Sequence, residues 1–456
     1  MEKHPWEQLG ELVESGTVDE VDQFLESLPA GETARAVSRL SEEEQTRLLT
    51  RHPADQAVEL IQGVSEAQAA ELIQLLPPAD AAAIVDQMES DERADLLAEL
   101  GDKEAEAILA EMDPAEAADV RHLVRYEAET AGGLMITEYL CYTDDQTVRD
   151  VLDDLRANAE QYTGYYVQYA YVVGAGQRTE DSPGVLTGVL RLRDLLLSPS
   201  HRPISEIMIR DPLAVRVGAE LDELMHFFDR HHFFGVPVID AENRLVGVVC
   251  RHDVEEALAG RADDDILKLQ GIVGEELRTM PLSVRAGHRL TWLSANIVLN
   301  LIAVSVIAFY EATLEAVIAL AVFLPLISDM GGNAGVQAIA VSIRELSLGL
   351  LKPYELMWVA LKEASVGLVN GLVLGILVGL AGWIWQRNVY LGLVVGGAMM
   401  LNTVIATIVG GAMPLILKRF NVDPALASGP LLTTVTDMTG FFLVLSFATF
   451  ALSRLV

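Results

Sequence analysis

Apolar positions in the first part of the chain recur every twelve residues, and each is followed by a turn-type or polar residue. The recurring positions are Leu28, Leu40, His52, Val64, Leu76, Met88, Leu100 and Met112. Short helices at a fixed period cannot bury their apolar faces alone and must stack on their neighbours. The pattern therefore predicts an α-solenoid over roughly residues 10–130. His52 is one position of this apolar series, so we do not expect it to be a ligand.

From about residue 136 the pattern changes to short apolar runs that alternate with helical segments. The order β-α-β-β-α occurs twice, first from Leu140 to a helix near Arg193 and then from Leu213 to Asp253. With the segments 236–240 and 245–249, this order resembles a tandem pair of CBS domains. Such pairs serve either as sensors, commonly of adenosine nucleotides, or as structural dimerisation units. The sequence leaves both roles open.

The last part of the chain contains long apolar stretches at about 287–310, 316–343, 357–385, 390–417 and 426–453. Crossing a bilayer takes about 20 apolar residues, so we expect five membrane spans. Lys and Arg gather before the first span, around the connection after the second and at the connection after the fourth. This bias predicts a cytoplasmic N-terminus and an outer C-terminus. The N-terminus lacks the apolar run of a signal peptide, so we expect the soluble half to stay in the cytoplasm.

The net charge of −34 comes entirely from the soluble half. From Gly287 onward eight acidic residues balance eight basic ones, so the first 286 residues contain the other 58 of 66 acids and 24 of 32 bases. Such an acidic surface disfavours nucleic acid and attracts metal cations. The sequence shows no nucleophile with a base and no phosphate-binding loop, so we expect neither an enzyme nor an ATP-driven pump.

One carboxylate, Asp437, is the only ionisable residue in the apolar run 424–453. A charge near the middle of a span costs about 2.5 kcal/mol or more, so it usually faces a bundle interior or a water-filled path. Asp437 is therefore either a cation ligand or a structural carboxylate hydrogen-bonded between helices. The polar break 329–337 contains the second candidate, Asn333. Its glycines favour either tight helix packing or an unwound turn whose carbonyls, with Asn333, hold a hydrated cation.

Mg²⁺ suits such a path because it takes oxygen ligands and keeps several of its waters. One Asp from each subunit, paired across a two-fold axis, would provide few charges and several acceptors around a hydrated ion. The sequence therefore favours a magnesium pore between identical subunits.

Four motifs carry a resemblance that covers almost the whole chain. They are residues 126–135 (YEAETAGGLM), 331–335 (GGNAG), 422–426 (VDPAL) and 436–440 (TDMTG). Together with the CBS pair, they resemble the MgtE family of bacterial magnesium channels. The resemblance implies an α-helical membrane protein with five transmembrane helices, a cytoplasmic α-solenoid and tandem α/β CBS domains. It implies the boundaries 1–130 for the solenoid, 131–252 for the CBS pair, 253–272 for a linking plug helix and 273–456 for the pore domain.

The resemblance also implies the roles of individual residues. Asp437 would be the selectivity carboxylate, with Asn333 nearby. Cytosolic Mg²⁺ would bridge acids and lock the closed state, and the matching acids are Asp91, Asp95, Glu220, Asp222, Asp253, Glu256, Asp264, Asp265 and Asp423. ATP would bind Tyr169, Arg193, Asp194 and Phe233 and tighten the response to Mg²⁺.

This chain departs from the family pattern at four positions. They are His232 and Arg261, where acids are expected, Gly429 in place of a polar residue, and Asp329 as an added acid. We expect these changes to leave the pore intact and to weaken closure by Mg²⁺.

The function predicted from the sequence is a Mg²⁺-selective channel or transporter for magnesium uptake. It is a homodimer in the lipid of the bacterial inner membrane, closed by cytosolic Mg²⁺ and modulated by ATP. Two alternatives remain at this point: a carrier for Co²⁺ or Ni²⁺, and a membrane sensor without transport.

Overall fold

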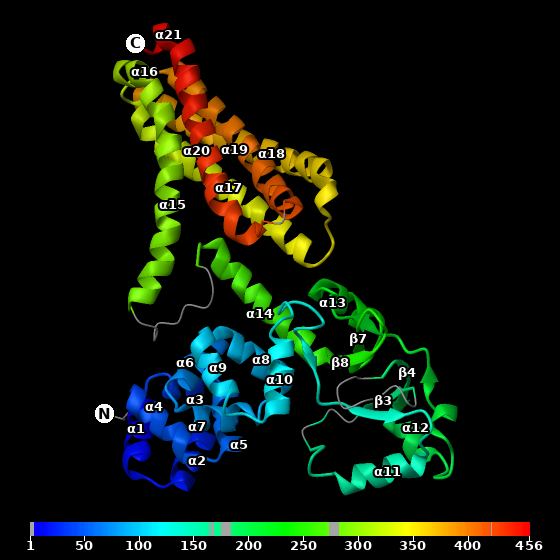
Figure 1. Ribbon diagram of the computed structural model, residues 1–456. Helices are drawn as coiled ribbons and strands as arrows, with labels where there is room; N and C mark the ends of the chain where they lie inside the picture. The colour runs from blue at the N-terminus through cyan, green and yellow to red at the C-terminus, as the bar shows by residue number, and fades with distance from the viewer. Residues whose placement is uncertain (1–3, 164, 166–167, 175–183, 273–281, 421) are drawn as a thin grey trace. The chain divides into compact units, whose positions relative to one another are not determined.

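The computed structural model describes residues 4–163, 165, 168–174, 184–272, 282–420 and 422–456. The chain folds as two units, Met1–Gly260 and Arg261–Val456 (Figure 1). The first unit contains a run of short helices followed by two small sheets, and the second is built from long helices.

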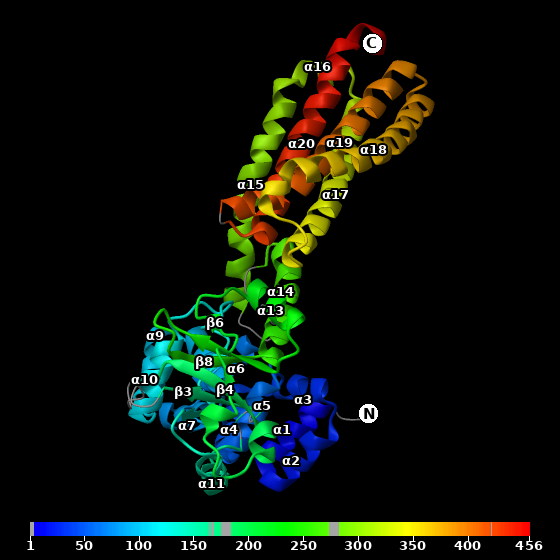
Figure 2. The same ribbon diagram turned by 90° about the vertical axis from the view of Figure 1, so that its right-hand side faces the viewer.

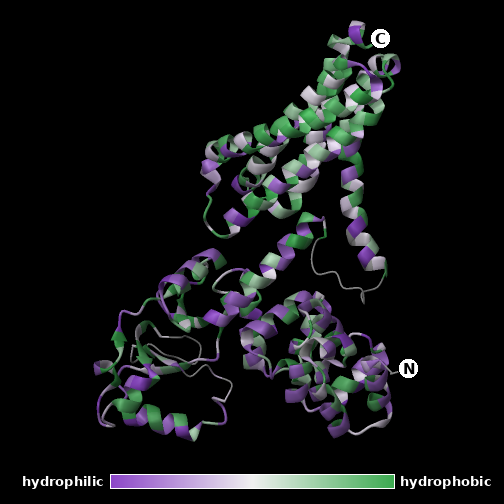
Figure 3. Ribbon diagram, turned by 180° about the vertical axis from the view of Figure 1, so that it is seen from behind, coloured by the Kyte–Doolittle hydropathy of each residue, from purple (hydrophilic) through white to green (hydrophobic). Residues whose placement is uncertain are grey.

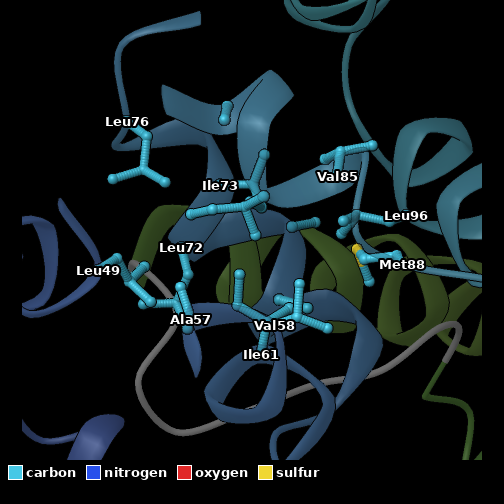
Figure 4. Close-up of a cluster of buried hydrophobic side chains, with 14 of the residues drawn as sticks. Leu49, Ala57, Val58, Ile61, Leu72, Ile73, Leu76, Val85, Met88 and Leu96 are labelled. Atoms are coloured by element: carbon cyan, nitrogen blue, oxygen red, sulfur yellow. The ribbon is translucent and has the colours of Figure 1, made fainter. Parts of the chain in front are cut away.

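Ten short helices form the beginning of the first unit. They are α1 (Pro5–Ser15), α2 (Val18–Ser27), α3 (Ala30–Val37), α4 (Glu42–Arg51), α5 (Ala54–Gln62), α6 (Glu66–Gln74), α7 (Pro78–Val85), α8 (Ser90–Glu99), α9 (Asp102–Leu109) and α10 (Pro114–Leu123). Polar residues cap several of them: the hydroxyl of Thr17 accepts from the amide of Glu20, and Ser41 does the same for Glu44. Figure 4 shows apolar side chains of α4 to α8 meeting in one core. The predicted stacking is confirmed.

The twelve-residue series continues through His52, which is buried as expected. Its ring is nevertheless hydrogen-bonded, with Nδ1 2.5 Å from the carbonyl of Leu48 and Nε2 3.0 Å from Asp22 Oδ1. A histidine therefore fits an apolar position here because both ring nitrogens have partners.

Two four-stranded sheets follow the solenoid. One has the order β2 (Leu140–Thr143), β3 (Tyr169–Val173), β4 (Leu186–Arg191), β5 (Ile209–Arg210), and the other has the order β1 (Met135–Ile136), β8 (Leu245–Cys250), β7 (Gly235–Ile239), β6 (Val215–Arg216). Helices α11 (Val148–Ala157) and α12 (Leu192–Leu197) belong to the first repeat, and α13 (Leu221–Arg230) and α14 (Arg251–Leu269) to the second. In both repeats the strand before the first helix pairs parallel with the strand after it, and that strand pairs antiparallel with the next. The predicted doubling of β-α-β-β-α is confirmed.

The solenoid is attached to the second sheet within the first unit. Ala94 of α8 and Leu123 of α10 share a core with Met135, Leu221 and Val236. At the rim of that core, Ser90 Oγ donates to Glu138 at 2.7 Å and accepts from the amide of Thr137 at 2.8 Å. Strand β1, which precedes both repeats in the sequence, pairs with the last strand, β8. The start of α8 is therefore fixed beside the CBS pair.

The second unit consists of long helices that run side by side (Figure 2). They are α15 (Leu282–Phe309), α17 (Leu320–Ser347), α18 (Leu356–Gln386), α19 (Val389–Arg419) and α20 (Pro424–Phe450), with short helices α16 (Glu311–Ala316), η2 (Pro353–Glu355) and α21 (Leu452–Leu455). The coloring in Figure 3 is predominantly hydrophobic along these long helices and mixed in the first unit. Within the described residues, four segments are long and apolar enough to cross a membrane: 285–309, 353–386, 389–419 and 424–450. The fifth expected span is α17, a 28-residue helix that contains the polar stretch 329–337, so the count of five spans stays a prediction.

Glycines bring the long helices into backbone contact. A Cβ at Gly375 of α18 would lie 2.6 Å from the carbonyl oxygen of Gly396 on α19, and one at Gly392 would lie 2.5 Å from that of Gly379. Small residues allow this close approach in a membrane, where packing between helices replaces the hydrophobic driving force. Helix α19 therefore packs tightly against α18 while its other faces contact α17 and α20.

Candidate functional site

Asp437 lies in the middle of α20, and its carboxylate is half-buried between helices. The hydroxyl of Ser328 on α17 donates to Asp437 Oδ1. An ionised carboxylate has about four acceptor positions, so this single hydroxyl leaves most of them for water or a cation. The structure thus combines the two readings of Asp437: the residue contacts a neighbouring helix and keeps acceptor capacity.

Helix α17 is continuous through the polar stretch, so the unwound turn considered for residues 329–337 is wrong. Gly331 and Gly335 are buried and lie where a Cβ would clash with Asn402 and with Leu432. Their role is close helix packing, because the helix keeps its backbone hydrogen bonds and frees no carbonyls for an ion. Asn333 lies on the exposed side of α17, and its Nδ2 donates to Asp329 Oδ2 at 3.3 Å.

A buried polar residue that the sequence interpretation missed is Asn402, in the middle of α19. Its Nδ2 donates to the carbonyl of Ile327 at 3.0 Å, and its Oδ1 accepts from Thr439 Oγ1 at 2.8 Å. It therefore links α17, α19 and α20 next to the Ser328–Asp437 contact. Asp437 was singled out as the only ionisable residue of its apolar run; Asn402 is the only amide or ionisable residue in the run 391–417, and a search for such side chains would have found it as well.

A cluster of carboxylates surrounds the start of α8 in the first unit. Burial, with Asp253 as the next contribution, raises the pKa of Asp91 to about 8. Burial and the neighbouring Glu92, Asp253 and Glu138 raise the pKa of Glu89 to about 7. Burial also raises the pKa of Asp253, although the amide of Cys250 donates to it at 3.2 Å. Each carboxylate resists ionisation here because burial removes water and like charges repel.

Asp95, also on α8, shares the neighbour Glu92 with Asp91 but is otherwise influenced by other acids. Burial raises its pKa to about 7, with further contributions from Glu66, Glu99 and Glu92. The two predicted residues of α8 therefore share one acidic neighbour and differ in the others.

The remaining predicted acids of the first unit lie elsewhere. Glu220 precedes α13 as an exposed residue whose backbone bridges to Thr130, and Asp222 is in the first turn of α13. Glu256 is exposed on α14 and lies 3.7 Å from His252 Nε2. In the part of the chain that the structure describes, no group of three or more His, Cys, Asp or Glu side chains is arranged to hold a metal ion.

The C-terminal end of α14 packs against the membrane helices inside the second unit. Leu269 contacts the cluster formed by Ile339, Ile343, Ala425 and Leu432. Asp265 is on the same turn of α14 as Asp264.

Lys268, which the sequence interpretation did not name, connects two predicted acids. Its Nζ lies 3.8 Å from Asp264 Oδ2 and 3.6 Å from Asp423 Oδ2. Asp423 also caps α20, since its Oδ1 accepts from the amide of Ala425 at 2.8 Å. Asp264 of α14 and Asp423 at the start of α20 therefore face a common cation, which in this structure is the lysine ammonium.

The residues predicted to bind ATP are only partly brought together. Tyr169 lines a cavity of about 30 Å³ between the two sheets, together with Tyr139, Phe234 and Cys250. Phe233 instead packs on Phe227 and His231 in the second repeat, with ring centroids 6.0 Å and 5.4 Å away. Phe234, the next residue, is thus the aromatic residue on the cavity.

Arg193 and Asp194, the charged residues of this predicted site, form contacts within their own segment of the chain. Arg191 Nε donates to Asp194 at 2.9 Å, and Arg193 Nε lies 3.6 Å from Asp194. Ligand sites usually measure about 300 Å³ or more, so the cavity beside Tyr169 does not fit a nucleotide in this conformation.

Comparison with known families gives three matches along the chain. The profile "MgtE intracellular N domain" matches residues 28–129, "CBS domain" matches 204–260, and MgtE, described as "Divalent cation transporter", matches 324–447. Each profile falls on a part with the corresponding fold: the solenoid, the second β-α-β-β-α repeat and the long helices.

Similar proteins cover most of the chain. The magnesium transporter MgtE of Thermus thermophilus is 37% identical over 73% of this chain and 72% of its own length. That of Enterococcus faecalis is 33% identical over 73% of this chain and 71% of its own length. Among solved structures, the cytosolic domain of the Mg²⁺ channel MgtE in complex with ATP is 30% identical, covers 55% of this chain and 98% of that one, and has a TM-score of 0.48.

Proposed function

Because the chain belongs to the MgtE family and is a magnesium transporter, we propose that Mg²⁺ crosses the membrane past Asp437 and that cytosolic Mg²⁺ closes this path. We propose a homodimer in the bacterial inner membrane, with a cytoplasmic N-terminus, an outer C-terminus and the path on the two-fold axis. The observation that carries the proposal is the carboxylate of Asp437, half-buried in the middle of a long apolar helix.

The surroundings of Asp437 support a hydrated Mg²⁺ ion over a softer metal. The contact from Ser328 is neutral and cannot balance a carboxylate charge, so a cation stabilises the ionised form. Helices α17 and α20 are described in full and contain neither His nor Cys. Carboxylate and hydroxyl oxygens suit Mg²⁺, whereas imidazole suits Ni²⁺ and other transition metals. The side chains of these two helices therefore favour Mg²⁺ over the alternative of a Co²⁺ or Ni²⁺ carrier.

The carboxylates around Asp91 support closure by cytosolic Mg²⁺. Asp91 belongs to the solenoid and Asp253 to the first turn of α14; burial raises the pKa of both carboxyl groups, and repulsion from Asp253 adds to the rise at Asp91. A divalent cation relieves this repulsion and stabilises the arrangement in which the acids are close, by mass action. We propose the same role for Asp264 and Asp423, which share Lys268 in this structure.

Helix α14 offers the mechanical link for gating. It is continuous from Arg251 to Leu269, with Asp253 in its first turn and Leu269 packed on α17 and α20 residues in the second unit. Displacement of α14 when the acids lose Mg²⁺ would disturb the start of α20, which leads to Asp437. With His232 and Arg261 in place of acids, we expect closure to need more Mg²⁺ than in relatives with acids there.

Nucleotide binding by the CBS pair is kept as a separate proposal. Tyr169, Arg193, Asp194 and Phe233 do not surround a space of nucleotide size, and Phe234 lies closer to the cavity than Phe233 does. Binding would require the cavity to widen, and the proposed transport and closure do not depend on it.

The test is Mg²⁺ flux into liposomes that contain the purified full-length protein, with Mg²⁺ titrated on each face. We expect flux that Mg²⁺ on the cytosolic face inhibits. Replacing Asp264 and Asp265 by Ala should shift this inhibition to higher Mg²⁺. Flux that ignores cytosolic Mg²⁺ in both proteins would contradict the closure proposal and leave the path past Asp437 in place. Absence of Mg²⁺ flux in the unmodified protein would contradict both.

A further inference from the structure

Asp329 is a second carboxylate in the membrane unit, and its position has no role in the function proposed above. It lies in the middle of α17 and is exposed on the single subunit. A charged side chain in a membrane span is costly unless it meets water, a cation or a partner group. The exposed carboxylate therefore requires an explanation.

The contact between Ser328 and Asp437 fixes the level of Asp329. Ser328 donates to Asp437, and Asp329 is the next residue of the same continuous helix. One residue advances an α-helix by about 1.5 Å. The backbone of Asp329 is thus at nearly the same depth as that of Ser328, beside Asp437.

The order of side chains around α17 shows the side on which Asp329 lies. Gly331 faces Asn402 of α19, while Ser328 and Gly332 face Asp437 and Thr436 of α20. Each residue turns the helix by about 100°, so Asp329 follows Ser328 on the flank that continues past α20, away from α19. On α20, Thr433 is exposed one turn before Asp437. Polar groups of both helices are therefore presented on neighbouring exposed surfaces.

Asp329 belongs to a polar row on this flank. Asn333 and Gln337 follow it at intervals of four residues, and both are exposed. The Asn333 amide donates to Asp329 Oδ2 at 3.3 Å, which orients the carboxylate and leaves its other acceptor positions free. Such a row of oxygen-bearing side chains suits a hydrated cation better than hydrocarbon.

We propose that Asp329 is a specificity-determining residue of the cation path, forming with Asn333 a second oxygen site at the level of Asp437. The proposal rests on the transport path past Asp437. Two carboxylates at one level attract a divalent cation more strongly than a monovalent one, because the interaction scales with the ion's charge. Asp437 is then needed for passage, and Asp329 sets the affinity for Mg²⁺ and the preference over K⁺.

The first test is flux in liposomes by the full-length protein and by Asp329→Asn. The variant keeps the side-chain shape and removes the charge. We expect it to transport Mg²⁺, to need about tenfold more Mg²⁺ for half-maximal flux, and to lose several-fold preference for Mg²⁺ over K⁺. Glu315→Gln, which removes an exposed carboxylate from α16, is the matched control and should behave as the unmodified protein. Half-saturation and preference unchanged in Asp329→Asn would overturn the proposal.

The second test examines whether water reaches position 329, and it holds even if Asp329→Asn fails to fold. Asp329→Cys is placed in a chain carrying Cys141→Ala and Cys250→Ala and is treated with a charged, water-soluble thiol reagent in lipid vesicles. We expect modification that Mg²⁺ slows. Val373→Cys, at an exposed apolar position of α18, should stay unmodified. A cysteine at 329 as unreactive as the one at 373 would place the residue against lipid or protein and overturn the proposal.

These outcomes are separable from failure of the proposed function. If the unmodified protein moves no Mg²⁺, the transport path is wrong, whereas the thiol measurement still reports the surroundings of position 329.

Discussion

The two units use carboxylates in opposite ways. Around Asp91 in the first unit, several acids are crowded and partly buried, so that their pKa values rise to about 7 or 8. In the second unit, Asp437 is the only charged residue of α20 and contacts the hydroxyl of Ser328. Crowding would make the stability of the first unit depend on bound cation, as the proposed sensor requires. Few carboxylates on separate helices, Asp437 on α20 and the proposed Asp329 on α17, would make a site that attracts an ion and still releases it, as the proposed path requires.

The largest expected effect comes from neutralising the isolated carboxylate. Asp437→Asn keeps the shape and the contact with Ser328 but removes the charge that attracts the ion. We expect Mg²⁺ flux in liposomes to fall by about a hundredfold or more, equivalent to about 2.7 kcal/mol. Glu315→Gln again serves as the control. Flux near the unmodified level in Asp437→Asn would end the distinction between the two regions, because the isolated acid would then be structural.

Replacing an aspartate by asparagine in the crowded region should stabilise the protein, whereas Asp437→Asn should remove transport. Asp91→Asn removes a charge that burial and Asp253 disfavour, and an amide oxygen can still accept from the backbone of Glu92. In chelator at about pH 8 we expect the thermal midpoint of the first unit to rise by about 2–4 °C. The stabilisation by Mg²⁺ should shrink at the same time. Differential scanning calorimetry of the full-length protein with chelator and with Mg²⁺ measures both.

The proposed role of the crowded acids is wrong if Asp91→Asn has a lower thermal midpoint than the unmodified protein in chelator and if Mg²⁺ raises the midpoint of both proteins equally. Asp145→Asn, at an exposed position before α11, is the control for removing an acid from the same unit.

A pH titration tests the raised pKa values of the crowded acids. Acids whose folded pKa is raised favour folding at pH values below their unfolded pKa, and this contribution is lost as the pH rises through the folded pKa. For Glu89, Asp91 and Asp95, that loss begins near the unfolded pKa of about 4 and is complete near the folded values of about 7 to 8. In chelator, hydrogen exchange of peptides from α8 should therefore become faster between about pH 4 and pH 8 beyond the intrinsic rate increase, and this excess should level off at higher pH.

With saturating Mg²⁺ the ionised acids gain a partner, and this excess exchange should be much smaller. Peptides from α2, outside the cluster, provide the reference. Protection of α8 that grows with pH in chelator would contradict the raised pKa values as the cause.

The smallest expected effect concerns Lys268, where a lysine stands between two acids. Its contacts with Asp264 and Asp423 involve partly exposed side chains, and such pairs are worth about 0–1 kcal/mol. Lys268→Met frees both carboxylates for Mg²⁺, so we expect the inhibitory cytosolic Mg²⁺ concentration to fall by about two- to threefold. Lys103→Met, at an exposed position of α9, should leave it unchanged. A rise with Lys268→Met would show that the lysine helps closure.

The candidate site was predictable from sequence where one residue carries its own signal. Asp437 stands alone in an apolar run, and its place inside a helix bundle follows from the cost of a charge in hydrocarbon. Asn402 carries the same kind of signal and was overlooked. Phe233 and Phe234 are adjacent aromatic residues, and only the direction of the chain entering β7 decides which one lies on the cavity.

The sequence by itself determined the elements that depend on local periodicity. The twelve-residue period predicted the stacked helices α1 to α10, and the alternation of apolar runs predicted the doubled β-α-β-β-α order. Both succeed because the spacing of apolar residues within a segment shows which face of that helix or strand is buried. The apolar composition of the last part likewise identified the long helices. The motifs, read as a resemblance, identified the family.

The tertiary structure decided what distant segments do together. It kept α17 helical, because Gly331 and Gly335 satisfy close packing against α19 and α20 without breaking a backbone hydrogen bond. It placed Asp91 beside Asp253, more than 150 residues later in the chain, and put Lys268 between Asp264 and Asp423. Such pairings have no local signal, since a side chain's charge and polarity are fixed by its type while its neighbours depend on how the whole chain packs.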